Sequence, residues 1–99
     1  AYPCVVKPLQ LNGSRGVMRA DDPAGFVAAA RRLARLLDRL AGDAAPKPFL
    51  VEDFIPGAEV ALEGLIDRGR LQLLALFDKP DPLDGPFFEE TIYVTPSRH

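Results

Sequence analysis

The chain is 99 residues long, is 47% apolar and carries a formal net charge of −2 at pH 7 with its histidine neutral. This length allows one small domain, and the apolar fraction is sufficient for a folded core. The slight negative charge gives no electrostatic case for binding nucleic acid or an anionic membrane, and no apolar run approaches the ~18 residues that a membrane span requires.

The single cysteine bears on the cellular compartment of the protein, and the start of the chain bears on whether it is part of a longer polypeptide. The single cysteine, Cys4, cannot form an intramolecular disulfide, which favours a reducing, cytoplasmic setting. Within an apolar segment such a cysteine is usually a small buried hydrophobe. The chain lacks an initiator Met, and an apolar segment begins within a few residues of Ala1. We therefore expect residues 1–99 to be one domain cut from a longer polypeptide.

The first twenty residues predict a hairpin with a long tip. A β-branched stretch between Pro3 and Pro8 predicts a strand of about five residues that ends at Lys7. The polar segment 10–16 contains two glycines and predicts a turn or flexible loop. Residues 17–20 predict the return strand.

One long helix is predicted next. Asp22 supplies an N-cap, Pro23 suits the first helical position, and Gly42 is a natural end. Apolar residues recur at spacings of three and four along one face, namely Phe26, Ala30, Leu33, Leu37 and Leu40. Arginines crowd the other face, namely Arg31, Arg32, Arg35 and Arg39. That basic stripe is either a binding surface or a solvated face whose aliphatic stems cover apolar neighbours.

The second half of the chain predicts strands, and its elements complete an α+β fold. After a linker at 42–48, strands are predicted at 49–55, 58–67, 70–79 and 91–96, with a tight turn at 67–69 and a proline-rich loop at 80–90. Most of these strands are joined by hairpins. We therefore expect a mostly antiparallel sheet with the long helix on one face.

A lysine at the end of a strand, followed by a loop of small residues, suggests polyphosphate binding. Lys7 supplies a point charge, while the loop "NGSRG" at 12–16 allows backbone N–H groups to approach phosphate oxygens. The order excludes a Walker A loop, in which the lysine follows the glycines and opens a helix. The alternative is an ordinary hairpin tip.

Two acids flank an apolar kink in "FLVEDFIPGAEVALEGLI" at 49–66. An unpaired charge inside such a run is costly, so each acid is expected to have a partner. A strand exit beside Phe54 and Ile55 suits a flat ring such as adenine, whose edge Glu52 would read, and Glu59 would accept the hydroxyls of a ribose. Alternatively, Glu52 and Glu59 are salt-bridged or lie at an exposed edge.

Three segments, "VVKPLQLNGSRGV", "FLVEDFIPGAEVALEGLIDRGRL" and "FDKPDPLDGPFFEETIYVTPSR", together resemble the central nucleotide-binding subdomain of an ATP-grasp enzyme. Among ATP-grasp enzymes the pattern is similar to carboxylate–amine ligases of the L-amino-acid ligase kind. The resemblance covers nearly the whole chain. It implies a parent ligase that binds ATP and Mg²⁺ and activates a carboxylate as an acyl phosphate before an amine attacks it.

The resemblance also implies roles for individual residues. Lys7 would contact the α- and β-phosphates of ATP, and the glycine-rich stretch would form a mobile lid over them through Gly13, Ser14, Arg15 and Gly16. Glu52 would approach the exocyclic amine of adenine, followed by Asp53 (where several relatives carry a lysine), by Phe54, and by Ile55, whose N–H would bond the ring. Glu59 would bind the ribose. Lys79 resembles the lysine that approaches the terminal phosphate and is the one candidate catalytic residue.

Some parts of the family pattern are expected outside this chain. The magnesium ligands of the family lie downstream of His99, and the only late acids here, Glu89 and Glu90, do not match them. A domain that shapes the other side of the site would lie upstream. We therefore expect this piece alone to hold part of a nucleotide and to be inactive, because phosphoryl transfer depends on metal ions that neutralise the phosphates.

Two alternatives to an amino-acid ligase remain at this stage. One is a biotin-carboxylase-like ATP-grasp protein that activates bicarbonate. The other is a non-catalytic module that binds nucleotide without turning it over. In each case the expected partners are ATP, small substrates and the rest of the parent polypeptide.

Overall fold

The computed structural model describes residues 1–42, 47–81, 84–88 and 91–99. The chain forms two compact units, one of Ala1–Pro56 with Asp84–Glu90 and one of Gly57–Leu83 with Thr91–His99. The first break falls at the Pro56–Gly57 kink. No helix in the described residues is long and apolar enough to cross a membrane.

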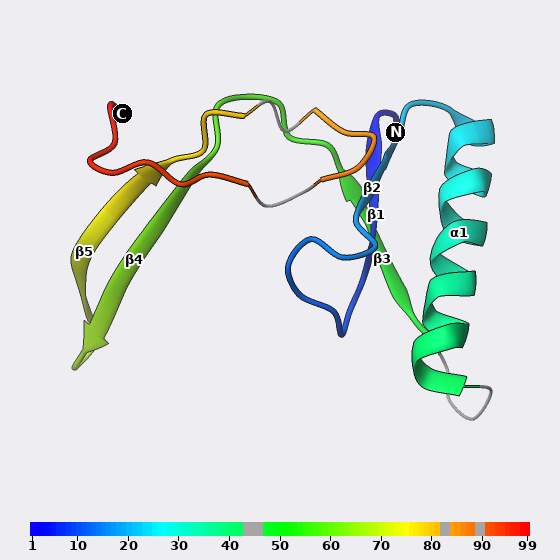
Figure 1. The fold of residues 1–99 in the computed structure, drawn as a ribbon, viewed down its shortest axis with the longest axis horizontal. Helices are drawn as coiled ribbons and strands as arrows, with labels where there is room; N and C mark the ends of the chain where they lie inside the picture. Colours follow the sequence, from blue (N-terminus) through cyan, green and yellow to red (C-terminus); the bar gives the residue numbers. More distant parts are fainter. Residues whose placement is uncertain (43–46, 82–83, 89–90) are drawn as a thin grey trace. The chain divides into compact units, whose positions relative to one another are not determined.

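The first unit is a three-stranded antiparallel sheet with a helix on one face (Figure 1). Its strands are β1 (Cys4–Pro8), β2 (Met18–Ala20) and β3 (Phe49–Asp53), in the order β2-β1-β3. The helix, α1 (Pro23–Ala41), packs against β1 and β2. Its predicted ends are confirmed, since the Asp22 carboxylate accepts a hydrogen bond from the Gly25 N–H at 2.7 Å and Gly42 caps the last turn.

The core of the first unit lies between α1 and the sheet. Its buried residues are Val6, Met18, Ala29, Leu33 and Leu37. Leu11, Phe26 and Leu36 pack against them from the edge. Cys4 is also buried, as predicted. The predicted apolar face is rotated slightly, because Ala29 is buried while Leu40 is 45% exposed near the end of α1.

The second unit is an antiparallel ribbon of β4 (Val60–Asp67) and β5 (Arg70–Asp78). The predicted turn between them is confirmed, with Arg68 and Gly69 both at positive φ. One helix with antiparallel sheets of three and two strands confirms the α+β fold within the described residues.

Two strand predictions need correction. The strand predicted at 49–55 ends at Asp53, because the N–H of Phe54 turns to the Pro3 carbonyl at 3.2 Å. The strand predicted at 91–96 does not form, and Val94 makes only an isolated bridge with Asp78. Pro96 has no N–H to offer a ladder, and the Ser97 N–H bonds the Leu76 carbonyl at 3.2 Å.

Candidate nucleotide-binding site

Lys7 and Glu52, assigned to phosphate and adenine by the resemblance, are bonded to each other. Their strands are antiparallel neighbours, with Val5 opposite Glu52 and Lys7 opposite Leu50. Lys7 and Glu52 are therefore diagonal partners on one face of the sheet. The Lys7 Nζ donates to Glu52 Oε1 at 2.6 Å. Val6 is fully buried beneath α1, so the alternation of side chains places this pair on the face opposite the helix.

The residues that follow Glu52 differ in the direction of their side chains and in their backbone hydrogen bonds. Asp53 pairs in register with the buried Cys4, so its side chain is directed to the opposite face from Glu52. The Phe54 N–H is occupied by the Pro3 carbonyl. The next backbone donor along the chain is Ile55, whose side chain is 85% exposed. Glu52 and Asp53 therefore face opposite sides of the sheet, and the assignment of Glu52, Asp53 and Ile55 to a nucleotide stays a prediction.

The ring of Phe54 is held by two residues that the sequence interpretation missed. The guanidinium carbon of Arg19 lies 4.3 Å from the ring centroid, and the Phe88 ring stacks at 6.4 Å with an interplanar angle of 27°. Arg19 also donates from Nη1 to the Asp84 carbonyl at 2.9 Å, and its backbone N–H donates to the Pro86 carbonyl at 2.9 Å. Segment 84–88 is thereby fastened along the edge of β2. The only sequence signal was an arginine within a short strand.

The loop between β1 and β2 consists of two consecutive turns. The Arg15 N–H donates to the Asn12 carbonyl and the Val17 N–H to the Ser14 carbonyl, each at 3.2 Å. Gly13 and Ser14 both have positive φ, at 61° and 57°, and glycine accepts this conformation far more readily than serine. Residues held in sparsely populated backbone regions gather at functional sites.

The last glycine of the loop is fixed by close approach to the helix. A Cβ at Gly16 would lie 3.1 Å from both Leu33 Cδ1 and Leu36 Cδ2, and φ is 80°. The Leu11 side chain anchors the other end of the loop on the core. The loop residues line a cavity with arginines of α1, and Lys7 is not among the residues that line it.

The other two candidate residues form an ion pair within the second unit. The ammonium of Lys79 donates to a carboxylate oxygen of Glu59, and the Lys79 N–H reaches the Glu59 carbonyl at 3.3 Å. The Lys79 side chain is 14% exposed, while half of Glu59 is open to solvent. The Lys79 ammonium also lies 5.3 Å from the Tyr93 ring centroid. The Glu59 and Lys79 side chains therefore hold each other in one arrangement.

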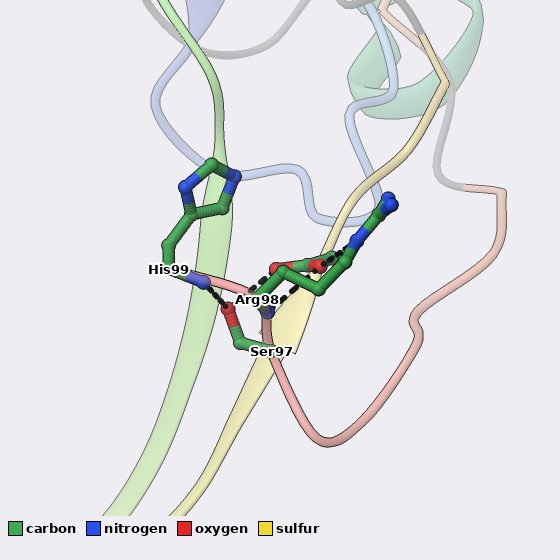
Figure 2. A network of polar contacts seen from close by, with 4 residues as sticks. Ser97, Arg98 and His99 are labelled. Carbon is green, nitrogen blue, oxygen red and sulfur yellow. Dashed lines mark hydrogen bonds and ion pairs between the residues drawn. The ribbon is translucent and has the colours of Figure 1, made fainter.

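Figure 2 shows a polar network that the sequence interpretation missed, in which Ser97, Arg98 and His99 are labelled. Asp78, at the end of β5, is the centre of this network. Its carboxylate is buried and accepts hydrogen bonds from the Ser97 hydroxyl and from the Arg98 N–H at 3.1 Å. These donors, Ser97 first, hold the pKa of Asp78 below its ordinary value. His99 donates its N–H to the Ser97 Oγ at 3.0 Å. The network fastens segment 94–99 to β5.

No group of three or more His, Cys, Asp or Glu side chains gathers as a metal site in the described residues. Glu89 and Glu90 lie outside those residues. The described residues therefore do not fit a bound magnesium ion, and the expectation that its ligands lie elsewhere in the parent protein stays a prediction.

Comparison with known proteins gives the family. The sequence model of the ATP-grasp domain matches residues 1–98. The chain therefore belongs to the ATP-grasp domain family. This family is enzymatic, uses ATP with Mg²⁺ and catalyses reactions of the ATP-dependent ligase type. The comparisons with curated proteins and with solved structures gave no match.

Proposed function

We propose that residues 1–99 are the nucleotide-binding subdomain of an ATP-dependent carboxylate–amine ligase of the L-amino-acid ligase kind. The observation that carries this proposal is the match of the ATP-grasp domain model over residues 1–98. The four charged candidate residues are ion-paired, as the alternative interpretation of Glu52 and Glu59 expected, and the proposal requires each pair to contact ligand as well. Lys7 is bonded to Glu52, and Lys79 to Glu59. Each pair joins a cation suited to phosphate with an acid suited to adenine or ribose.

The pairs prepare these side chains for a ligand without using up their hydrogen-bonding capacity. A lysine ammonium has three donors and a carboxylate has two acceptor oxygens, so each partner can bind ligand while it stays paired. The Lys7 and Glu52 side chains are 33% and 48% exposed, which leaves both accessible. In this proposal Lys7 binds the inner phosphates, Ser14, Arg15 and the amides of Gly13 and Gly16 cover them, Glu52 and Ile55 hold adenine, and Glu59 binds the ribose.

The proposed reaction has two steps. A carboxylate oxygen of the first substrate attacks the γ-phosphorus of ATP, which gives an acyl phosphate and ADP. The amine of the second substrate then attacks the acyl carbon, releases inorganic phosphate and loses a proton to form the amide. Lys79 would hold the transferred phosphate as a point charge. Magnesium would neutralise the phosphates, and its ligands are proposed to lie outside this chain.

Exposed apolar side chains support the proposal that the chain belongs to a larger enzyme. Six apolar residues of the β4–β5 ribbon are each more than half exposed, namely Leu62, Leu65, Ile66, Leu71, Leu73 and Leu74. Isolated domains rarely expose so many neighbouring large apolar residues, and further parts of the enzyme would cover them.

Phosphate release from ATP tests this function. The full-length protein is incubated with ATP, Mg²⁺ and pairs of amino acids, and a parallel set contains bicarbonate in place of the carboxylate substrate. Release that requires both an amino-acid carboxylate and an amine supports the proposal. Release with bicarbonate alone would instead identify the biotin-carboxylase-like alternative. Tight ATP binding without release under any pair would identify a non-catalytic module.

A further inference from the structure

The first unit contains a basic cavity on its helix. The cavity has a volume of about 870 Å³, within the range of about 300–1,000 Å³ typical of small-molecule sites. It is lined by the loop residues 12–18, by Arg32, Arg35, Leu36 and Arg39 of α1, and by Phe87. No acidic residue is among them, although acids outnumber bases in the whole chain.

The arginines around this cavity differ from most other cations of the protein. Six of the twelve lysines and arginines form ion pairs among the described residues. Four of the remaining six line the cavity, and these are Arg15, Arg32, Arg35 and Arg39. Arg35 and Arg39 are one helical turn apart, and like charges at this spacing repel. An anion in the cavity would remove that repulsion.

The rest of the lining suits a ligand that carries phosphate. Gly13 and Ser14 line the cavity as two successive residues with positive φ, and concave turns of successive backbone amides can bind anions. Arg32 is already positioned, because its guanidinium carbon lies 4.8 Å from the centroid of the Phe87 ring. Guanidinium groups match phosphate oxygens in geometry as well as in charge.

We propose that this cavity is a second anion site, which binds a small molecule with two or more phosphate groups. The cavity and the nucleotide site share Gly13, Ser14, Arg15 and Gly16 and differ in their other residues, since Lys7, Glu52, Phe54 and Ile55 do not line the cavity. Three of the four arginines lie on α1, which packs on the face of the sheet that carries Val6, while Lys7 is directed to the other face. The loop at 12–16 is common to both sites.

Calorimetric titration with inorganic tripolyphosphate, at constant ionic strength and without nucleotide or metal, tests the proposal. Tripolyphosphate can occupy the site at Lys7 as well as the arginine cavity, so the full-length protein is expected to bind two equivalents. Arg35→Gln should weaken one of these binding events by about tenfold or more, the loss of one charge-assisted contact. Arg31→Gln is the matched control, because Arg31 is an exposed arginine of the same helix that does not line the cavity. It should change neither event by as much as about twofold.

Lys7→Ala separates this inference from the proposed function. It should remove one binding event and leave the one that depends on Arg35. If the wild type shows only the binding event that depends on Arg35, the arginine cavity is an anion site and the assignment of Lys7 to the nucleotide phosphates is wrong. The inference is overturned if binding is unaffected by Arg35→Gln, if Arg31→Gln weakens it equally, or if the wild type binds no tripolyphosphate. Circular dichroism and thermal unfolding establish that each variant is folded, which is expected because Arg31 and Arg35 are exposed and Lys7 is partly exposed.

Discussion

The Lys7 ammonium and the Glu52 carboxylate are hydrogen-bonded at 2.6 Å across the β1–β3 ladder. The register places these residues diagonally on the sheet face that is free of the helix. One residue therefore holds the other in position before any ligand arrives. In the proposed function a nucleotide contacts both side chains while they stay paired.

Replacing Lys7 with alanine should weaken ATP binding by about 1 to 3 kcal/mol, the range for a charge-assisted contact. The measurement is calorimetric titration of the full-length protein with ATP. Lys47→Ala is a suitable control, because Lys47 is also ion-paired but its partner, Asp38, is not a candidate site residue. An unchanged ATP affinity in a folded Lys7→Ala protein would remove Lys7 from the site.

The loop should be mobile without nucleotide and ordered with it. Its two turns are each closed by one backbone hydrogen bond, while Leu11 and Gly16 are anchored on the core and on α1. We expect the amides of residues 12–15 to exchange hydrogen rapidly in the free protein and several-fold more slowly with ATP. The turn at 67–69 serves as an internal control and should be unaffected. If the amides of residues 12–15 exchange hydrogen at the same rate with and without ATP, the loop is a plain hairpin tip and not a lid.

The Asp78 network should make stability depend on pH. Because hydrogen bonds lower the pKa of Asp78 in the folded state, its ionised form favours folding. This contribution is present above the unfolded pKa, about 4, and is lost as the pH falls through the lower folded value. Asp78→Asn should therefore lower the unfolding temperature at pH 7, and the difference from wild type should shrink below about pH 4.

The exposed Asp67 provides the control for this experiment. It lies 3.9 Å from an almost fully exposed Arg68, so Asp67→Asn should have little effect at any pH. Ser97→Ala should reproduce part of the Asp78→Asn effect, since the Ser97 hydroxyl is a donor to the carboxylate. A difference between Asp78→Asn and wild type that is the same at pH 7 and pH 3 would contradict the electrostatic explanation.

Arg19 should position Phe54 and the segment at 84–88. Arg19→Gln removes the contact with the Phe54 ring, the bond from Nη1 to the Asp84 carbonyl and an ion pair with the exposed Asp21, which adds little. The expected loss of stability is about 1 to 2 kcal/mol, the sum of one cation–π contact and one charged hydrogen bond after competition with water. Chemical denaturation measures it, with Arg70→Gln as the control because Arg70 is exposed. An Arg19 variant as stable as the control would show that segment 84–88 is held without this side chain.

Local signals in the sequence were sufficient for much of the fold. The helix is bounded by Asp22, Pro23 and Gly42, and the turn at Arg68–Gly69 is determined by its own residues. The failed strand at 91–96 shows the limit of local signals. Its β-branched composition favours a strand, but the outcome depends on Asp78, which lies more than ten positions earlier and draws Ser97 and Arg98 into a different arrangement.

That the acids of the candidate site have partners could be predicted in a similar way, while the roles of these residues toward a ligand stay predictions. Lys7, Glu52 and Glu59 stand out as charges beside apolar strands, and each proves to have a charged partner. The identity of those partners depends on strand register, which the sequence alone did not provide. For the arginines of α1 the signal was their spacing, but only the position of the loop shows that three of them line a cavity.

The assignment of Glu52 to the base and Glu59 to the sugar is the central claim, and discrimination between nucleotides tests it. GTP has a carbonyl where ATP has the exocyclic amine, so Glu52→Ala should narrow the preference for ATP over GTP. Glu59→Gln should leave that preference unchanged and reduce the preference for ATP over 2′-deoxy-ATP. Each change should be about 1 to 2 kcal/mol, the scale of a hydrogen bond to a charged acceptor.

The decisive measurement is a set of calorimetric affinities for ATP, GTP and 2′-deoxy-ATP on the wild type and four variants of the full-length protein. Asp53→Ala is the control for Glu52, because it lies on the same strand with its side chain on the other face. Glu63→Gln is the control for Glu59, as an exposed acid of β4. We expect each site variant to lose one nucleotide preference and keep the other, while the control variants keep both. Equal losses for all three nucleotides, or unchanged discrimination in both site variants, would mean that Glu52 and Glu59 hold the fold and not the ligand.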